Sequence, residues 1–257
     1  MSATVASVRR PDAPVLVTRD GVVLAARWWL PSGGDRATVV LAHGFSASKD
    51  DGQLVAVAEV LRRAGYAVLS YDARGHAGSG GLCTMGDLER LDVAAAVAEA
   101  RTRSAPVVAV GASMGAIAVL RYAATDPDLA GVVSVSSPAL WRLPSNVRTL
   151  GAAMLTRTRA GRRLAERWMH VRVSPRWDDP EPPKRLAARL SVPLAVVHGG
   201  RDRFIEPSEA PLLAAAAPRA RLLLVPAMRH AFDRAAVPAV REAVDWVLEA
   251  SAHPSGT

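Results

Sequence analysis

Short apolar runs alternate with longer amphipathic stretches along most of the chain. The runs are rich in valine, leucine and alanine, which is typical of strands buried on both faces of a parallel sheet. The stretches between them have the length and spacing of helices. The predicted strands cover residues 38–42, 66–71, 107–110, 129–135, 194–197 and 222–225, and the predicted helices cover residues 51–64, 87–101, 114–124, 208–216 and 237–250. This alternation predicts an α/β fold with a mostly parallel central sheet and helices on both faces.

Two strands of another kind precede the alternation. Residues 15–18 and 22–30 alternate apolar with polar side chains, and the Asp20-Gly21 pair between them is a hairpin turn signal. We expect this hairpin to form an antiparallel edge of the sheet. Residues 1–13 are expected to be a flexible N-terminal tail, and residues 251–257 a C-terminal tail.

The segment 139–190 interrupts the alternation and predicts an inserted helical cap, or lid. The core would then consist of residues 14–138 and 191–250. One stripe of apolar residues has helical spacing: Leu143, Val147, Leu150 and Met154. A second helix is suggested by Leu164 and Trp168, and the segment also carries Trp141 and Trp177. Two roles stay open for the stripe, because it could pack the cap onto the core or also line an acyl pocket beneath it.

The charge is concentrated in the same segment. The chain carries a net charge of +8, and of its 32 basic residues only Lys49 and Lys184 are lysine. Residues 139–190 contain twelve basic and four acidic residues, so this segment accounts for the whole net charge. The arginines could form a solvated face, steer an anionic substrate or acyl carrier, or contact an anionic membrane surface. No recognised nucleic-acid module accompanies them, so nucleic acid is not expected as a partner.

Composition excludes several other classes of protein. A single cysteine, Cys83, excludes an internal disulfide framework and agrees with a cytoplasmic location. No cluster of cysteine and histidine has the spacing of metal ligands, so no metal site is predicted. No run of about 18 apolar residues predicts a membrane span. Residues 1–10 lack the apolar region of a signal peptide.

The strongest candidate for chemistry is the Gly-x-Ser-x-Gly motif around Ser113. It follows the predicted strand 107–110 and precedes a predicted helix, and this context is typical of a nucleophile elbow. Gly111 and Gly115 are expected because a Cβ at either position would collide where strand and helix approach each other. The amide of Met114, at the start of the helix, would point toward an oxyanion that forms over the serine.

A serine hydroxyl needs an adjacent base, and the base needs a carboxylate to orient it. In an open parallel sheet such groups lie in loops at the carboxyl ends of strands. Asp202 and His230 each come five residues after the end of a predicted strand, and the order along the chain is Ser, Asp, His. Glu206 and Asp233 are also candidates for the carboxylate.

The remaining titratable candidates have simpler structural interpretations. His43 and His76 lie in turn motifs where histidine commonly braces the backbone, and His198 lies at a strand end. Cys83 has no elbow around it, so a small buried thiol is the expected role. A catalytic role for these residues stays open beside the serine chemistry.

Together these motifs resemble the α/β-hydrolase superfamily. The resemblance is to the serine-hydrolase branch of monoacylglycerol lipases, carboxylesterases and serine aminopeptidase (S33)-like enzymes, and it extends over residues 14–250. The matching pieces are His43-Gly44-Phe45, Asp72-Ala73-Arg74-Gly75-His76, Gly111-Ala112-Ser113-Met114-Gly115, His198-Gly199-Gly200-Arg201-Asp202 and His230. The family usually has Gly-His-Gly where this chain has Gly75-His76-Ala77.

The resemblance implies a serine hydrolase that cleaves a carboxylic ester without metal or organic cofactor. Ser113 would be the nucleophile, His230 the general base and Asp202 its orienting carboxylate. The backbone amides of Phe45 and Met114 would form the oxyanion hole. Trp141, Leu143, Val147 and Leu150 are the candidates for substrate binding.

Other functions share this framework. A thioesterase or acyltransferase on a carrier-bound acyl chain would use the same three residues. An amidase or peptidase and a non-catalytic binding protein are also open. The expected partner is a small acyl ester, amphiphilic or anionic, with an acyl carrier or a membrane surface as a possible second contact through the basic cap.

Overall fold

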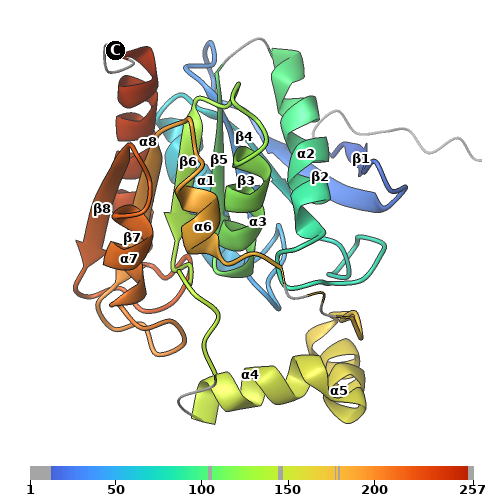
Figure 1. Ribbon diagram of the computed structural model, residues 1–257. Helices are drawn as coiled ribbons and strands as arrows, with labels where there is room; N and C mark the ends of the chain where they lie inside the picture. The colour runs from blue at the N-terminus through green and yellow to red at the C-terminus, as the bar shows by residue number, and fades with distance from the viewer. Residues whose placement is uncertain (1–12, 104–105, 144–146, 177, 179, 254–257) are drawn as a thin grey trace, which may run out of the picture.

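An eight-stranded sheet forms the centre of the computed structural model, which describes residues 13–103, 106–143, 147–176, 178 and 180–253. The strand order is β1-β2-β4-β3-β5-β6-β7-β8 (Figure 1). The strands are β1 (Val15–Val17), β2 (Val23–Trp29), β3 (Thr38–Ala42), β4 (Ala67–Tyr71), β5 (Val107–Ala112), β6 (Gly131–Val135), β7 (Leu194–Gly199) and β8 (Ala220–Val225). The strands β3 to β8 pair in parallel, while β1 and β2 pair antiparallel at one edge, as the sequence predicts.

Two layers of helices cover the sheet. The helices are α1 (Gly52–Arg63), α2 (Glu89–Ala100), α3 (Met114–Ala123), α4 (Val147–Arg157), α5 (Arg159–Met169), α6 (Pro183–Ala187), α7 (Glu209–Ala214) and α8 (Ala236–Ala252), and a short 3₁₀ turn covers Arg101–Arg103. Buried side chains of α1 and α8 pack on one face of the sheet. Those of α2, α3, α6 and α7 pack on the other, which faces the viewer in Figure 1. The prediction of helices on both faces is confirmed.

The sheet strands are apolar because they are enclosed on both sides. Every residue of β3, β4, β5, β6 and β7 is buried. Polar side chains are therefore found at the ends of these strands, where the connecting loops reach water. The carboxyl ends of the parallel strands thus become the place where chemistry can gather.

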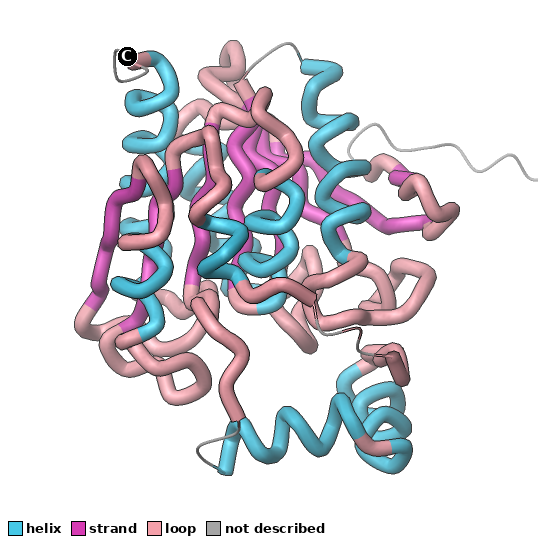
Figure 2. Tube along the Cα trace, viewed as in Figure 1, coloured by secondary structure: helices cyan, strands magenta, loops and turns pink. Residues whose placement is uncertain are grey.

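The long connection between β6 and β7 forms a separate helical hairpin. Figures 1 and 2 show α4 and α5 beyond one end of the sheet, apart from both helical layers. The two helices pack so closely at Gly161 that a Cβ on this residue would collide with the backbone of Met154 and Leu155. We call these two helices the α4–α5 hairpin.

The predicted apolar stripe of this segment was wrong in two respects. Leu143 lies outside the helix, which begins at Val147 in the described chain. The stripe also does not pack onto the core: Val147 is 86% exposed, and Leu150 and Met154 are each 55% exposed. The physical reason is that the hairpin stands off the sheet, so only its inner side can contact the core.

Several expected features lie at the limits of the described residues. The predicted tails fall mostly on residues 1–12 and 254–257, which are outside the described residues, as is Trp177. Ser251 and Ala252 belong to α8, so the C-terminal tail starts later than predicted. Within the described ranges, no helix is long and apolar enough to cross a membrane.

Candidate active site

Ser113 lies in the turn between β5 and α3. Its backbone has φ 52° and ψ −113°, a conformation that non-glycine residues rarely adopt. A Cβ on Gly111 would collide with the backbone of Gly115, and a Cβ on Gly115 would collide with the carbonyl oxygens of Ala42 and His43. The two glycines therefore allow strand and helix to approach closely enough to hold the strained turn.

His230 connects the serine to a carboxylate. The Ser113 hydroxyl lies 3.0 Å from Nε2 of His230, and Nδ1 of the same ring lies 2.7 Å from Oδ2 of Asp202. A carboxylate can only accept here, so Nδ1 carries the proton and Nε2 is free to accept the hydroxyl hydrogen. Three residues from the loops after β5, β7 and β8 thus form one hydrogen-bonded chain.

Asp202 is held as an anion. Burial raises the pKa of its carboxyl, but the hydrogen bond from His230 and those from the backbone amides of Phe204 and Ile205 outweigh it, and the net pKa lies below the usual value. The two amides donate to Oδ1 at 2.8 and 3.0 Å, which leaves Oδ2 for the histidine. The orientation of the carboxylate is therefore fixed by its own loop, and its negative charge is stabilised by that loop together with His230.

The amides of Phe45 and Met114 lie beside the serine. Met114 is the first residue of α3, and the loop after β3 brings Gly44 next to Ser113, where an added Cβ would lie 3.4 Å from the Ser113 Cβ. Neither amide donates a backbone or side-chain hydrogen bond among those found within the described chain. Both N–H groups are thus available to a ligand oxygen.

His43 and His76 brace the loop that carries Phe45. The amide of Ala73 donates to Nε2 of His43, and Nδ1 of His43 donates to the Gly44 carbonyl. The amide of Ser46 donates to Nε2 of His76 at 3.4 Å. Burial lowers the pKa of both rings, that of His76 to about 4, so both are neutral. Their interactions agree with the structural interpretation made from the sequence.

Four more titratable residues that the sequence singled out make no hydrogen bond to Ser113 or His230 among the contacts of the described residues, although Nε2 of His198 lies 3.6 Å from Oδ2 of Asp202. Asp233 pairs with Arg229, and Glu206 makes no hydrogen bond to His230. His198 is fully buried, and its Nε2 lies 3.1 Å from the Ile205 carbonyl. Cys83 contacts the Met114 sulfur at 3.5 Å, and burial raises the pKa of its thiol well above the usual value, which disfavours the thiolate.

A cavity of about 940 Å³ opens over Ser113 and His230. It lies between the loops at the carboxyl ends of the strands and the inner side of the α4–α5 hairpin. Of the residues proposed for substrate binding, Trp141, Leu143 and Val147 line it, whereas Leu150 does not. Among the described residues, no group of three or more histidine, cysteine, aspartate or glutamate side chains is placed to hold a metal ion.

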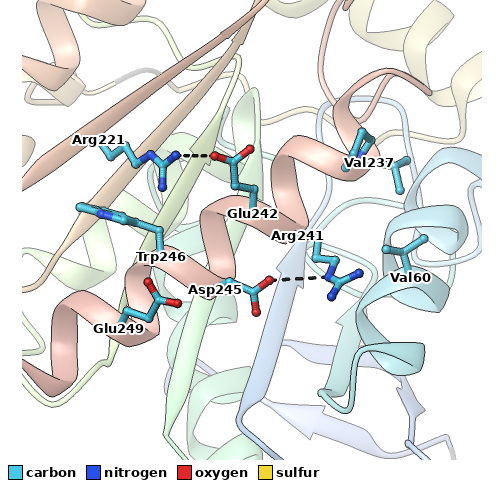
Figure 3. A pocket seen from close by; sticks show the side chains of 9 residues that line it. Val60, Arg221, Val237, Arg241, Glu242, Asp245, Trp246 and Glu249 are labelled. Atoms are coloured by element: carbon cyan, nitrogen blue, oxygen red, sulfur yellow. Dashed lines mark hydrogen bonds and ion pairs between the residues drawn. The ribbon is translucent and has the colours of Figure 1, made fainter.

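A second cavity, of about 460 Å³, is lined by residues of α8, by Val60 of α1 and by Arg221 of β8 (Figure 3). Four of its five charged residues form ion pairs, since Arg221 pairs with Glu242 and Arg241 lies 3.6 Å from Asp245. It contains no serine, cysteine or histidine. Of these two cavities, the one over Ser113 is therefore the one that holds the candidate residues for chemistry.

Known proteins resemble this chain in sequence and in fold. The family model described as serine aminopeptidase, S33, matches residues 33–181. The chain belongs to this family. The S33 chain is 30% identical to monoglyceride lipase of Rattus norvegicus over 145 residues, and the aligned region covers 54% of this chain and 47% of that protein. It is 31% identical to non-heme chloroperoxidase of Burkholderia pyrrocinia over 141 residues, and the aligned region covers 52% of this chain and 49% of that protein.

The S33 chain thus spans about half the length of the relatives that it matches. Among solved structures, an esterase of Pyrococcus furiosus superposes with a TM-score of 0.67 at 23% identity, and the match covers 93% of this chain and 90% of that chain. At this identity the likeness concerns the fold, and it identifies the fold of this chain as that of α/β-hydrolases.

Three residues of this S33 protein contribute to the site without having been predicted. Phe204 packs against His230, with ring centroids 5.0 Å apart. The Ser136 hydroxyl accepts the amide of Ala231 at 3.1 Å and so holds the loop of the histidine. The buried Glu209 accepts the amides of Ala139 and Leu140, where the chain leaves the core toward α4. Of these three residues, only Phe204 could have been predicted from the sequence, because it lies two residues after Asp202.

Proposed function

We propose that this S33 protein cleaves a carboxylic ester through an acyl-enzyme on Ser113. The observation that carries the proposal is the hydrogen-bonded chain from Ser113 through His230 to Asp202, at 3.0 and 2.7 Å, on the floor of a large cavity. The printed names of two relatives, both monoglyceride lipases, support an ester as the substrate.

In the first half of the proposed reaction, the Ser113 oxygen attacks the ester carbonyl carbon while its proton passes to Nε2 of His230. The carbonyl oxygen becomes an anion, which the amides of Phe45 and Met114 stabilise. Loss of one such donor typically costs about a hundredfold or more in rate. The intermediate then collapses, the alcohol oxygen leaves with the proton from His230, and the acyl group stays on the serine.

In the second half, water attacks the acyl carbon while His230 accepts one of its protons. Collapse of this intermediate returns the proton to the serine oxygen and releases the carboxylic acid. Asp202 stays ionised throughout and stabilises the imidazolium that forms twice in each cycle. No further reactant is needed, because water supplies both the oxygen and the proton.

We also propose that the α4–α5 hairpin, within the predicted cap of residues 139–190, acts as a lid on the core formed by residues 14–138 and 191–250. The end of the predicted cap differs, because α6 packs on the sheet with the core helices. The inner side of the hairpin forms one wall of the cavity, where Leu155 is partly buried against the core. Closing a wall over the reacting groups excludes water and strengthens their electrostatic interactions. Trp141, Leu143 and Val147 would then contact the substrate.

A thioesterase or acyltransferase is the second candidate function. The basic charge of residues 139–190 favours it, because a positive surface beside the cavity would attract an anionic acyl carrier or an anionic membrane. The three groups at the base of the cavity would act in the same way on a thioester. Product analysis with competing acceptors would distinguish transfer from hydrolysis.

Hydrolysis of p-nitrophenyl esters from acetate to palmitate tests the ester proposal. The wild-type protein should release p-nitrophenol with an optimum that reflects the cavity length, and Ser113→Ala should reduce the rate by about 10³-fold or more. A matched control is Ser251→Ala, at the far end of α8, which should keep the wild-type rate. Full activity in Ser113→Ala would refute the proposal.

A further inference from the structure

We propose that the wall of the cavity formed by the α4–α5 hairpin binds an anionic group on the alcohol part of the ester. The inference rests on the proposed function and specifies its substrate class: an ester whose leaving alcohol carries a phosphate or a carboxylate. Arg148 of α4 carries it, and Arg157 of α4 and Arg176 of the chain that returns to the core add positive charge elsewhere in the cavity lining.

The charges around the cavity are separated by sign. Every charged residue that α4 and residues 173–176 contribute to the lining is an arginine. The carboxylates of Asp51 and Glu206 both come from the core side, and Asp51 caps α1 by accepting the amide of Gln53. The remaining pair, Arg142 with Glu209, neutralises itself. One wall is therefore cationic and faces a substrate that enters between the hairpin and the core.

Arg148 contacts the Phe204 ring, which in turn contacts His230. Its guanidinium carbon lies 5.6 Å from the centroid of the Phe204 ring, over the ring face. The same ring packs against His230 at 5.0 Å between centroids. A cation–π contact with the ring restricts the guanidinium before any ligand arrives, which lowers the entropic cost of binding.

The chemistry of the reaction places the alcohol part of the ester on the side of the cavity where Phe204 and Arg148 lie. The leaving oxygen must take its proton from Nε2 of His230, so the alcohol part of the ester lies on the histidine side of Ser113. The acyl carbonyl is directed away from it, toward the amides of Phe45 and Met114. Because Phe204 packs against the histidine and Arg148 lies over Phe204, an anion on the alcohol reaches Arg148. We expect an anion on the acyl chain to be directed away from Arg148.

The size of the effect follows from the exposure of the wall. All three arginines are solvent-exposed, so screening reduces their attraction for an anion well below that of a buried pair. A charge-assisted contact under these conditions is worth about tenfold in affinity. We expect the preference to appear mainly in KM, since the anion is bound equally in the ground state and the transition state.

Four short glycerol-type esters test which anion is recognised and whether it must lie on the alcohol or on the acyl chain. 1-Butyrylglycerol is neutral, 1-butyrylglycerol 3-phosphate and 3-O-butyrylglycerate carry the anion on the alcohol, and 1-succinylglycerol carries it on the acyl chain. The wild-type protein should prefer the phosphate or the glycerate over the neutral ester by about tenfold in kcat/KM. The succinyl ester should show no such preference.

Two variants with the same loss of charge complete the test. Arg148→Gln should bring the ratio of anionic to neutral turnover close to one, while Arg163→Gln, on α5 and outside the cavity lining, should keep the wild-type ratio. Equal turnover of neutral and alcohol-anionic esters by the wild type, a preference for the succinyl ester, or the same change in both variants would overturn the anion site alone. Absence of turnover with all four esters would overturn the ester function as well.

Discussion

Acid should destabilise this protein through His76. The ring is 1% exposed, and burial together with the nearby His43 lowers the pKa of its imidazole from 6.5 to about 4. Between these two values the unfolded chain binds a proton that the folded chain does not, so stability falls as the pH falls from about 6.5 to 4 and is fully present above 6.5. At pH 4.5 the linkage costs about 2.5 kcal/mol of unfolding free energy.

Urea unfolding followed by tryptophan fluorescence at pH 7.5 and pH 4.5 measures this cost. Other groups titrate in the same range, so the informative quantity is the pH-dependent loss in the wild type minus that in His76→Gln. We expect this difference to be about 2 to 3 kcal/mol. His253→Gln, which removes an exposed histidine at the end of α8, should behave like the wild type. Equal losses in the wild type and His76→Gln would show that the ring does not stay neutral in the fold.

Three further substitutions test the framework around the serine. Gly115→Ala should destabilise the fold by about 3 kcal/mol in urea unfolding, because the added Cβ meets the backbone carbonyls of Ala42 and His43; a loss below about 1 kcal/mol would contradict the close approach. Ala77→Gly should raise the melting temperature by a few degrees, since Ala77 has φ 37°, and relieving that strain gains about 1 kcal/mol; an unchanged or lower value would refute it. Asp202→Asn should keep the melting temperature but lower ester kcat by about 10⁴-fold, because the histidine loses the partner that fixes its tautomer; a loss below tenfold would argue against this role.

The sheet and the meeting of Ser113, Asp202 and His230 were predictable because both depend on local patterns. Runs buried on two faces must be apolar, so the strands were visible as short apolar segments between helices. A serine between two glycines, after a strand and before a helix, has few other uses. Asp202 and His230 could be placed near Ser113 because parallel strands deliver their following loops to one edge of the sheet.

The placement of the α4–α5 hairpin was not predictable in the same way. Its apolar residues have helical spacing, which indicates a helix but does not say which side meets the core. In the structure the hairpin stands off the sheet, and Val147 and Met154 stay exposed. Contacts such as that of Arg148 with Phe204 join residues 56 positions apart in the chain, and only the tertiary structure reveals them.

Trapping the acyl-enzyme is the most direct test of the proposed mechanism. The protein would be mixed briefly with p-nitrophenyl butyrate, quenched in acid and digested, and the peptides measured by mass spectrometry. We expect a butyryl group on the peptide that contains Ser113, and none on the same peptide of Ser113→Ala. Turnover of the ester with no acyl group on Ser113, or with the group on another residue such as Cys83, would contradict the mechanism.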